Sequence, residues 1–193
     1  IGFMFAPIFH PAMKHAVGPR KELGMRTIFN LLGPLTNPAK ANRQVVGVFS
    51  PHLTEVFALV LAELGCEEAY VIHGHGGMDE LSLSGANKIT RLKNGRPETF
   101  TLTPEEVGLA RIDNSLLRGG SAQENARIML NILAGEKNAY RDAVLLNAAP
   151  CFVLAGLAND LKEGVSLAAE IIDKGQAMKK LEAWKDYSTK IAA

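Results

Sequence analysis

The pattern of apolar positions predicts two buried strands joined by a helix between residues 44 and 73. Residues 44–49 (QVVGVF) are β-branched and almost entirely apolar, as expected of a strand covered on both faces of a parallel sheet. Ser50-Pro51 then favours the start of a helix that we expect to reach about residue 64. Residues 69–73 (AYVIH) form a second apolar run. Strand, helix and strand in this order predict a right-handed βαβ unit.

An antiparallel hairpin is predicted next. Residues 88–92 and 98–102 are strand-like segments, and Asn94-Gly95 between them is a strong signal for a tight hairpin turn. Thr103 is followed by a proline and two glutamates, which combines a helix cap, a proline at the first helical position and acids in the first turn. A short helix should begin there.

The rest of the chain has the periodicity of helices. Ser121 and Glu124 have the spacing of a capping box, which predicts a helix towards residue 133. Apolar residues recur at helical spacing over residues 141–158 and again over residues 161–185. We therefore expect a helical layer beside the sheet.

The first 38 residues are less regular. Residues 10–23 are mostly compatible with a helix that Gly18-Pro19 breaks or kinks. Residues 27–32 are apolar, and residues 33–38 (GPLTNP) should form a loop, because two prolines and a glycine disfavour regular structure.

These elements predict an α/β fold: a largely parallel sheet flanked by helices, with an appended antiparallel hairpin. The chain has 193 residues, which suits one compact domain, and it contains no internal repeat or convincing linker. Residue 1 is not methionine, and the chain opens within an apolar run. We therefore expect the true amino terminus to lie upstream, so that residues 1–193 are a fragment of a longer protein.

Composition excludes several functional classes. Lys and Arg number 21 against 20 Asp and Glu, so there is no overall basic field to attract nucleic acid or an anionic membrane. Cys66 and Cys151 are far apart and outside any metal-binding or redox spacing, which suits a reducing cytoplasm. The apolar opening is too short for a signal peptide or a membrane span.

Asp79 and Glu80 are the candidate metal ligands. They follow the second predicted strand and a glycine-rich turn, where open α/β sheets bind ligands. Two adjacent carboxylates suit Mg²⁺, which usually shares its shell with water and substrate phosphates. Two solvated loop acids are the more common explanation of such a pair, and the residues alone do not form a diagnostic metal motif.

Arg20 is a candidate anion anchor, because its planar guanidinium can hold a carboxylate or phosphate through two hydrogen bonds. A surface arginine is the more common explanation of such a residue, and His10 before a proline is more often a helix-entry or packing residue than a ligand. No residue is identified as a catalytic acid, base or nucleophile, because neither a nucleophile elbow nor a catalytic cysteine signature is present.

Five segments resemble one family along nearly the whole chain. They are residues 10–38 (HPAMKHAVGPRKELGMRTIFNLLGPLTNP), 78–85 (MDELSLSG), 101–109 (TLTPEEVGL), 119–126 (GGSAQENA) and 161–184 (LKEGVSLAAEIIDKGQAMKKLEAW). In this order they resemble the anthranilate phosphoribosyltransferases. The resemblance implies transfer of a phosphoribosyl group from phosphoribosyl pyrophosphate to the amine of anthranilate, in tryptophan biosynthesis in the cytoplasm.

The resemblance also implies roles for particular residues. Arg20 matches the arginine that holds the anthranilate carboxylate, and His10 and Pro34 match residues that line the same pocket. Asp79 and Glu80 match the acids that bind Mg²⁺ with phosphoribosyl pyrophosphate. The family's glycine-rich diphosphate loop and small amino-terminal helical domain do not occur in this sequence. The resemblance thus implies that residues 1–193 are the carboxy-terminal α/β domain of a phosphoribosyltransferase, a fragment that is inactive alone and a homodimer when intact.

Two other functions remain open. One is a non-catalytic, nucleic-acid-binding paralogue of the same fold, against which the near-neutral charge argues. The other is a pyrimidine nucleoside phosphorylase of the same fold class, whose sequence blocks residues 10–38 do not resemble.

Overall fold

The computed structural model describes residues 2, 4–9, 18, 22, 24 and 29–192. It divides into two compact units, Ile1–Ala41 and Asn42–Ala193.

The first unit contains the helices α1 (Ala6–Phe9) and α3 (Phe29–Leu35). The loop predicted over residues 33–38 is wrong in its first part, because α3 continues through Pro34. Proline has no N–H to donate, so α3 lacks one helical hydrogen bond at Pro34 and ends at the next residue. The Thr36 hydroxyl then donates to the Leu32 carbonyl at 2.9 Å and closes the helix. The helix predicted over residues 10–23 falls largely outside the described residues.

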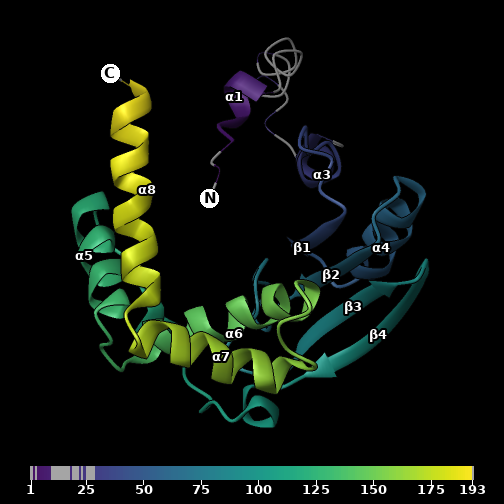
Figure 1. The fold of residues 1–193 in the computed structure, drawn as a ribbon. Helices are drawn as coiled ribbons and strands as arrows, with labels where there is room; N and C mark the ends of the chain where they lie inside the picture. The colour runs from purple at the N-terminus through teal and green to yellow at the C-terminus, as the bar shows by residue number, and fades with distance from the viewer. Residues whose placement is uncertain are drawn as a thin grey trace. The chain divides into compact units, whose positions relative to one another are not determined.

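The second unit is built on a four-stranded sheet, counted over the described residues, in the order β1-β2-β3-β4. Its strands are β1 (Arg43–Gly47), β2 (Glu68–His73), β3 (Asn87–Lys93) and β4 (Arg96–Leu102). β1 and β2 are parallel and are joined through α4 (Leu53–Glu63), while β2 with β3 and β3 with β4 are antiparallel. The predicted α/β class, the parallel βαβ pairing and the appended hairpin are confirmed (Figure 1). The described strands form a mixed sheet instead of a largely parallel one, because the hairpin joins the same sheet through two antiparallel pairings.

The hairpin turn forms as its sequence predicts. Asn94 and Gly95 have φ values of 52° and 72°, the left-handed conformation that a two-residue hairpin turn of the right twist requires. Lys93 pairs with Arg96 directly across this turn, so the turn sets the register of β3 against β4.

The helical half follows the sheet. It consists of the short 3-10 helices η2 (Pro104–Val107) and η3 (Asn114–Leu117) and the α-helices α5 (Ala122–Leu133), α6 (Ala139–Leu154), α7 (Leu161–Asp173) and α8 (Gln176–Ala192). Both predicted helix starts are capping boxes, Thr103 with Glu106 and Ser121 with Glu124. The helical stretch predicted over residues 161–185 is two helices, because Gly175, with φ 68°, ends α7.

The core lies on both faces of the sheet. Tyr70 and Ile72 of β2 pack into one cluster with buried residues of α6 and α7, which lie side by side (Figure 1). The intervening residue Val71 is also fully buried, and α4 packs against β2, β3 and β4. Because its faces are covered in this way, β2 is the continuous apolar run that was expected of a buried strand.

Candidate functional site

Asp79 and Glu80 lie in the loop that follows β2, at the carboxyl ends of the parallel strands β1 and β2, and both side chains are exposed. Their backbone lies so close to the strand ends that only glycine fits at positions 47 and 74. A Cβ at Gly47 would collide with the Asp79 carbonyl oxygen, and one at Gly74 would collide with the Glu80 carbonyl oxygen. The position predicted for the acid pair is therefore the usual ligand-binding edge of an open α/β sheet.

The glycines before the acid pair form the turn that brings it there. Gly76 and Gly77 have φ values of 79° and 83°, a conformation that other residues adopt at a cost. The backbone N–H of Gly77 donates to the Gly74 carbonyl at 3.2 Å. These glycines therefore have a structural role that accounts for their presence without a bound phosphate.

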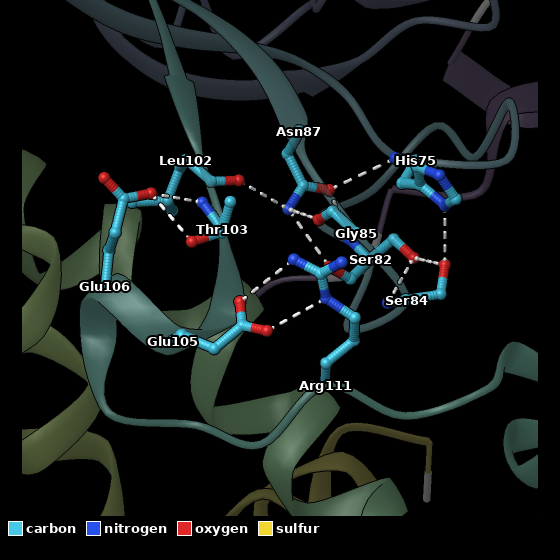
Figure 2. Close-up of polar contacts among 10 residues, drawn as sticks. All are labelled: His75, Ser82, Ser84, Gly85, Asn87, Leu102, Thr103, Glu105, Glu106 and Arg111. Atoms are coloured by element: carbon cyan, nitrogen blue, oxygen red, sulfur yellow. Dashed lines mark hydrogen bonds and ion pairs between the residues drawn. The ribbon is translucent and has the colours of Figure 1, made fainter.

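Asn87, the first residue of β3, holds the far side of the same loop (Figure 2). Its Oδ1 accepts from the backbone N–H of Ser82 at 2.7 Å and of His75 at 3.3 Å. Its Nδ2 lies 3.0 Å from the Ser82 carbonyl, 3.2 Å from that of Gly85 and 3.1 Å from that of Leu102. The side chain is fully buried, so this network fixes the loop to the ends of β3 and β4.

A second amide, Asn147 of α6, pairs with the residue directly after the acid pair. Its Oδ1 accepts from the Leu81 N–H at 2.8 Å, and its Nδ2 donates to the Leu81 carbonyl at 2.9 Å and to the Ala143 carbonyl at 3.0 Å. Sequence reasoning missed both amides. For Asn147 the available signal was an asparagine within an apolar stretch of helix, since a buried amide needs hydrogen-bond partners.

Two histidines stand near the same edge of the sheet. His73 contacts the Val48 carbonyl through Nδ1 at 2.9 Å, and because a carbonyl only accepts, this nitrogen carries the proton. The Nδ1 of His75 is 3.0 Å from the Ser84 hydroxyl, and the ring lies directly against Gly85, where a Cβ would collide with it. Both rings are thus held in place by the loop and strand backbone.

A hollow of about 410 Å³ lies next to Glu80. Its polar lining comes from Glu80, Asn114 and Asn125, and its apolar lining includes Met78, Ile128 and Tyr140. One residue of the acid pair, Glu80, therefore borders a concave, mainly apolar surface of the second unit.

The described residues could supply only part of the ligand shell of Mg²⁺. Among the described residues, no group of three or more histidine, cysteine, aspartate or glutamate side chains is placed to hold a metal. Asp79 and Glu80 offer two carboxylates, which are hard oxygen ligands, on a fixed backbone. That set suits an ion that completes its shell with water and phosphate oxygens, as Mg²⁺ does.

Of the three residues predicted to bind anthranilate, the structure describes one. Pro34 is exposed in the last turn of α3, in the first unit. Arg20 and His10 lie outside the described residues. Of the predicted site residues, the structure thus places Asp79, Glu80 and Pro34, and the metal role of the acid pair and the anthranilate pocket both stay predictions. In the part of the chain that the structure describes, no helix is long and apolar enough to span a membrane.

Comparison with known proteins assigns the class. Residues 1–178 match the family model described as glycosyl transferase family, a/b domain. The chain therefore belongs to the glycosyl transferase family through its α/β domain.

The curated relatives carry a more specific name than the family model does. The chain is 49% identical to the anthranilate phosphoribosyltransferase of Acetivibrio thermocellus over 97% of its own length and 54% of the relative's, and 54% identical to that of Afipia carboxidovorans over 94% and 54%. The resemblance noted in the sequence is confirmed. The chain spans about half the length of the curated relatives it matches.

Solved structures agree with this assignment. The anthranilate phosphoribosyltransferase of Thermus thermophilus superimposes with a TM-score of 0.88 at 48% identity, over 95% of this chain and 54% of that one. The Saccharomyces cerevisiae enzyme, solved in complex with PRPP and Mg, gives a TM-score of 0.85 at 34% identity, over 93% and 52%. A further structure of the yeast enzyme holds 4-fluoroanthranilate, at 33% identity and a TM-score of 0.88 over 96% and 54%.

Proposed function

We propose that this chain is the carboxy-terminal, larger part of an anthranilate phosphoribosyltransferase. The enzyme transfers the phosphoribosyl group of phosphoribosyl pyrophosphate to the amine of anthranilate and releases pyrophosphate, in the cytoplasmic pathway to tryptophan. The observation that carries the proposal is the acid pair Asp79-Glu80 fixed at the strand ends, in a chain similar to an enzyme solved with PRPP and Mg.

Asp79 and Glu80 would hold Mg²⁺ through their exposed carboxylates. When bound there with the diphosphate, the ion supplies charge neutralisation for the departing pyrophosphate. The loop residues contribute a fixed backbone, so that the carboxylates need little reorganisation when the substrate arrives. This arrangement agrees with a reaction whose main demand is on the leaving group.

Arg20 would bind the anthranilate carboxylate, with His10 and Pro34 lining the ring. An arylamine is already neutral at pH 7, so its nitrogen can attack without prior removal of a proton by a strong base. The work of Arg20 is then to orient the amine towards the ribose carbon, which lowers the barrier by positioning. No general base is required of the chain before attack.

The chain alone should be inactive, because it spans about half of the relatives' length and the rest of those proteins would supply most of the diphosphate site. We further propose that the full-length enzyme, meaning an enzyme of family length that contains this chain, is a homodimer. The test is pyrophosphate release from phosphoribosyl pyrophosphate with anthranilate and Mg²⁺. Full-length enzyme should give release that depends on anthranilate, and the 193-residue chain should give none; turnover by the pure chain would overturn the inactivity.

A further inference from the structure

We propose that Asn147 of α6 is a positioning residue for the metal-binding acid pair. It would act by clamping the backbone of Leu81, the residue that follows Glu80. The inference rests on the proposed function, because it assigns to Asn147 the task of aiming Asp79 and Glu80 at Mg²⁺.

The clamp has two points of contact on one residue. The Leu81 N–H and the Leu81 carbonyl oxygen both pair with the Asn147 amide, at 2.8 and 2.9 Å. The Leu81 N–H belongs to the same peptide plane as the Glu80 carbonyl. Fixing that N–H therefore fixes the orientation of the Glu80 backbone, from which the Glu80 carboxylate projects.

The amide is itself held in place. Its Nδ2 donates to the Ala143 carbonyl, one turn earlier in α6, at 3.0 Å, which sets the direction of the side chain. Leu81 is 2% exposed, so its backbone polar groups have little access to water as replacement partners. An apolar residue at position 147 would leave both groups without these bonds.

The remaining sides of the loop are held by other contacts. Upstream, the carbonyls of Asp79 and Glu80 lie against Gly47 and Gly74. Downstream, Asn87 holds Ser82. Asn147 connects the acid pair to the helical layer, while both acidic side chains stay exposed. The result is a fixed backbone that presents two free carboxylates, which is the arrangement that a preorganised metal site needs.

The test compares Asn147→Leu and Asn147→Asp in the full-length enzyme. Leucine has a similar size and no amide, whereas aspartate keeps an acceptor for the Leu81 N–H and loses the donor to its carbonyl. We expect the Mg²⁺ concentration for half-maximal rate to rise about tenfold in Asn147→Leu and by a smaller factor in Asn147→Asp, since a loosened loop weakens the metal site. The KM for anthranilate should stay within about twofold.

A matched control is Asn131→Leu, at an exposed position of α5. It makes the same chemical change away from the acid pair, and its Mg²⁺ dependence should equal that of the parent enzyme. A fall in rate for the Asn147 variants with an unchanged Mg²⁺ requirement would overturn the positioning role, because a merely structural residue changes the amount of active enzyme and not its metal affinity.

Two further measurements separate the possible failures. If Asp79→Asn with Glu80→Gln leaves the Mg²⁺ requirement unchanged, the proposed function fails at this site and the inference fails with it. If that double variant raises the requirement and the Asn147 variants do not, only the inference fails.

Hydrogen exchange of the Leu81 amide needs no variant. Protection comparable to the β3 amides is expected, and exchange at the rate of an exposed loop would overturn the clamp.

Discussion

Gly74 donates its backbone N–H to the carbonyl oxygen of Met78 at 2.8 Å, and this bond closes the turn between β2 and the acid pair. The turn reverses the chain so that Asp79 and Glu80 lie back against the ends of β1 and β2. The position of the candidate metal ligands is therefore set by backbone contacts at glycines, which makes these glycines a direct test of the geometry.

Gly74→Ala should disturb this packing more than Gly77→Ala. At Gly74 the new Cβ would meet the Glu80 carbonyl, a backbone atom that cannot move aside freely, and we expect a loss of about 2 to 3 kcal/mol in the free energy of unfolding. At Gly77 nothing lies within 4 Å, so only the cost of φ 83° remains, about 1 kcal/mol. Urea unfolding of the two variants measures the difference, and equal losses would contradict the close contact.

Asn87→Ala should be strongly destabilising. The substitution removes the partner of several buried backbone groups, and each such group left unpaired costs about 1 to 3 kcal/mol. We expect a total loss of about 3 kcal/mol or more by urea unfolding. The control Asn131→Ala, at an exposed helical position, should stay within about 0.5 kcal/mol of the parent. A small loss for Asn87→Ala would mean that the loop keeps its shape without this network.

The capping box of α5 predicts a dependence of stability on acid. Hydrogen bonds from the Ser121 backbone N–H, and then from its hydroxyl, lower the pKa of Glu124 below its ordinary value. A lowered pKa means that the ionised carboxylate stabilises the fold at neutral pH, and that this stabilisation is lost as the pH falls through the folded-state pKa.

Glu124→Gln should reduce that part of the acid response, because glutamine can still cap the helix and does not titrate. The melting temperature should fall less between pH 7 and pH 3 in the variant than in the parent chain. Glu136→Gln supplies a control, since Glu136 is exposed and follows α5 instead of capping it. Identical pH profiles for Glu124→Gln and the parent would show that the capping box does not contribute.

Arg20→Ala in the full-length enzyme should mainly weaken the use of anthranilate. Loss of a charged partner for a bound carboxylate costs about 1 to 3 kcal/mol, which is on the order of tenfold or more in kcat/KM for anthranilate. The KM for phosphoribosyl pyrophosphate should change little. Arg96→Ala, at the hairpin turn between β3 and β4, is the matched control. Unchanged anthranilate kinetics in Arg20→Ala would remove this residue from the proposed pocket.

The elements that could be predicted from the sequence are those set by neighbouring residues. Asn94-Gly95 forms the hairpin turn, and Ser121 with Glu124 starts α5, because both depend on contacts within a few positions. Pro34 is the instructive failure. Proline disfavours a helix in general, yet α3 continues through Pro34 without that residue's hydrogen bond and ends one residue later.

The contacts that hold the candidate site could not be predicted in the same way. Asn147 and Leu81 are 66 positions apart, and their pairing depends on how α6 packs beside the loop. Asp79 and Glu80 could be proposed from the sequence because adjacent acids after a strand are recognisable locally. The asparagines that fix them have partners that are known only once the chain is folded.

The measurement that tests the proposed function most directly is the loss of anthranilate fluorescence in the presence of full-length enzyme, phosphoribosyl pyrophosphate and Mg²⁺. We expect the fluorescence to fall only when both additions are present, and the fall to be much slower with Asp79→Asn and Glu80→Gln at the same Mg²⁺ concentration. Constant anthranilate fluorescence with folded, full-length enzyme and both additions would contradict the proposed transferase activity.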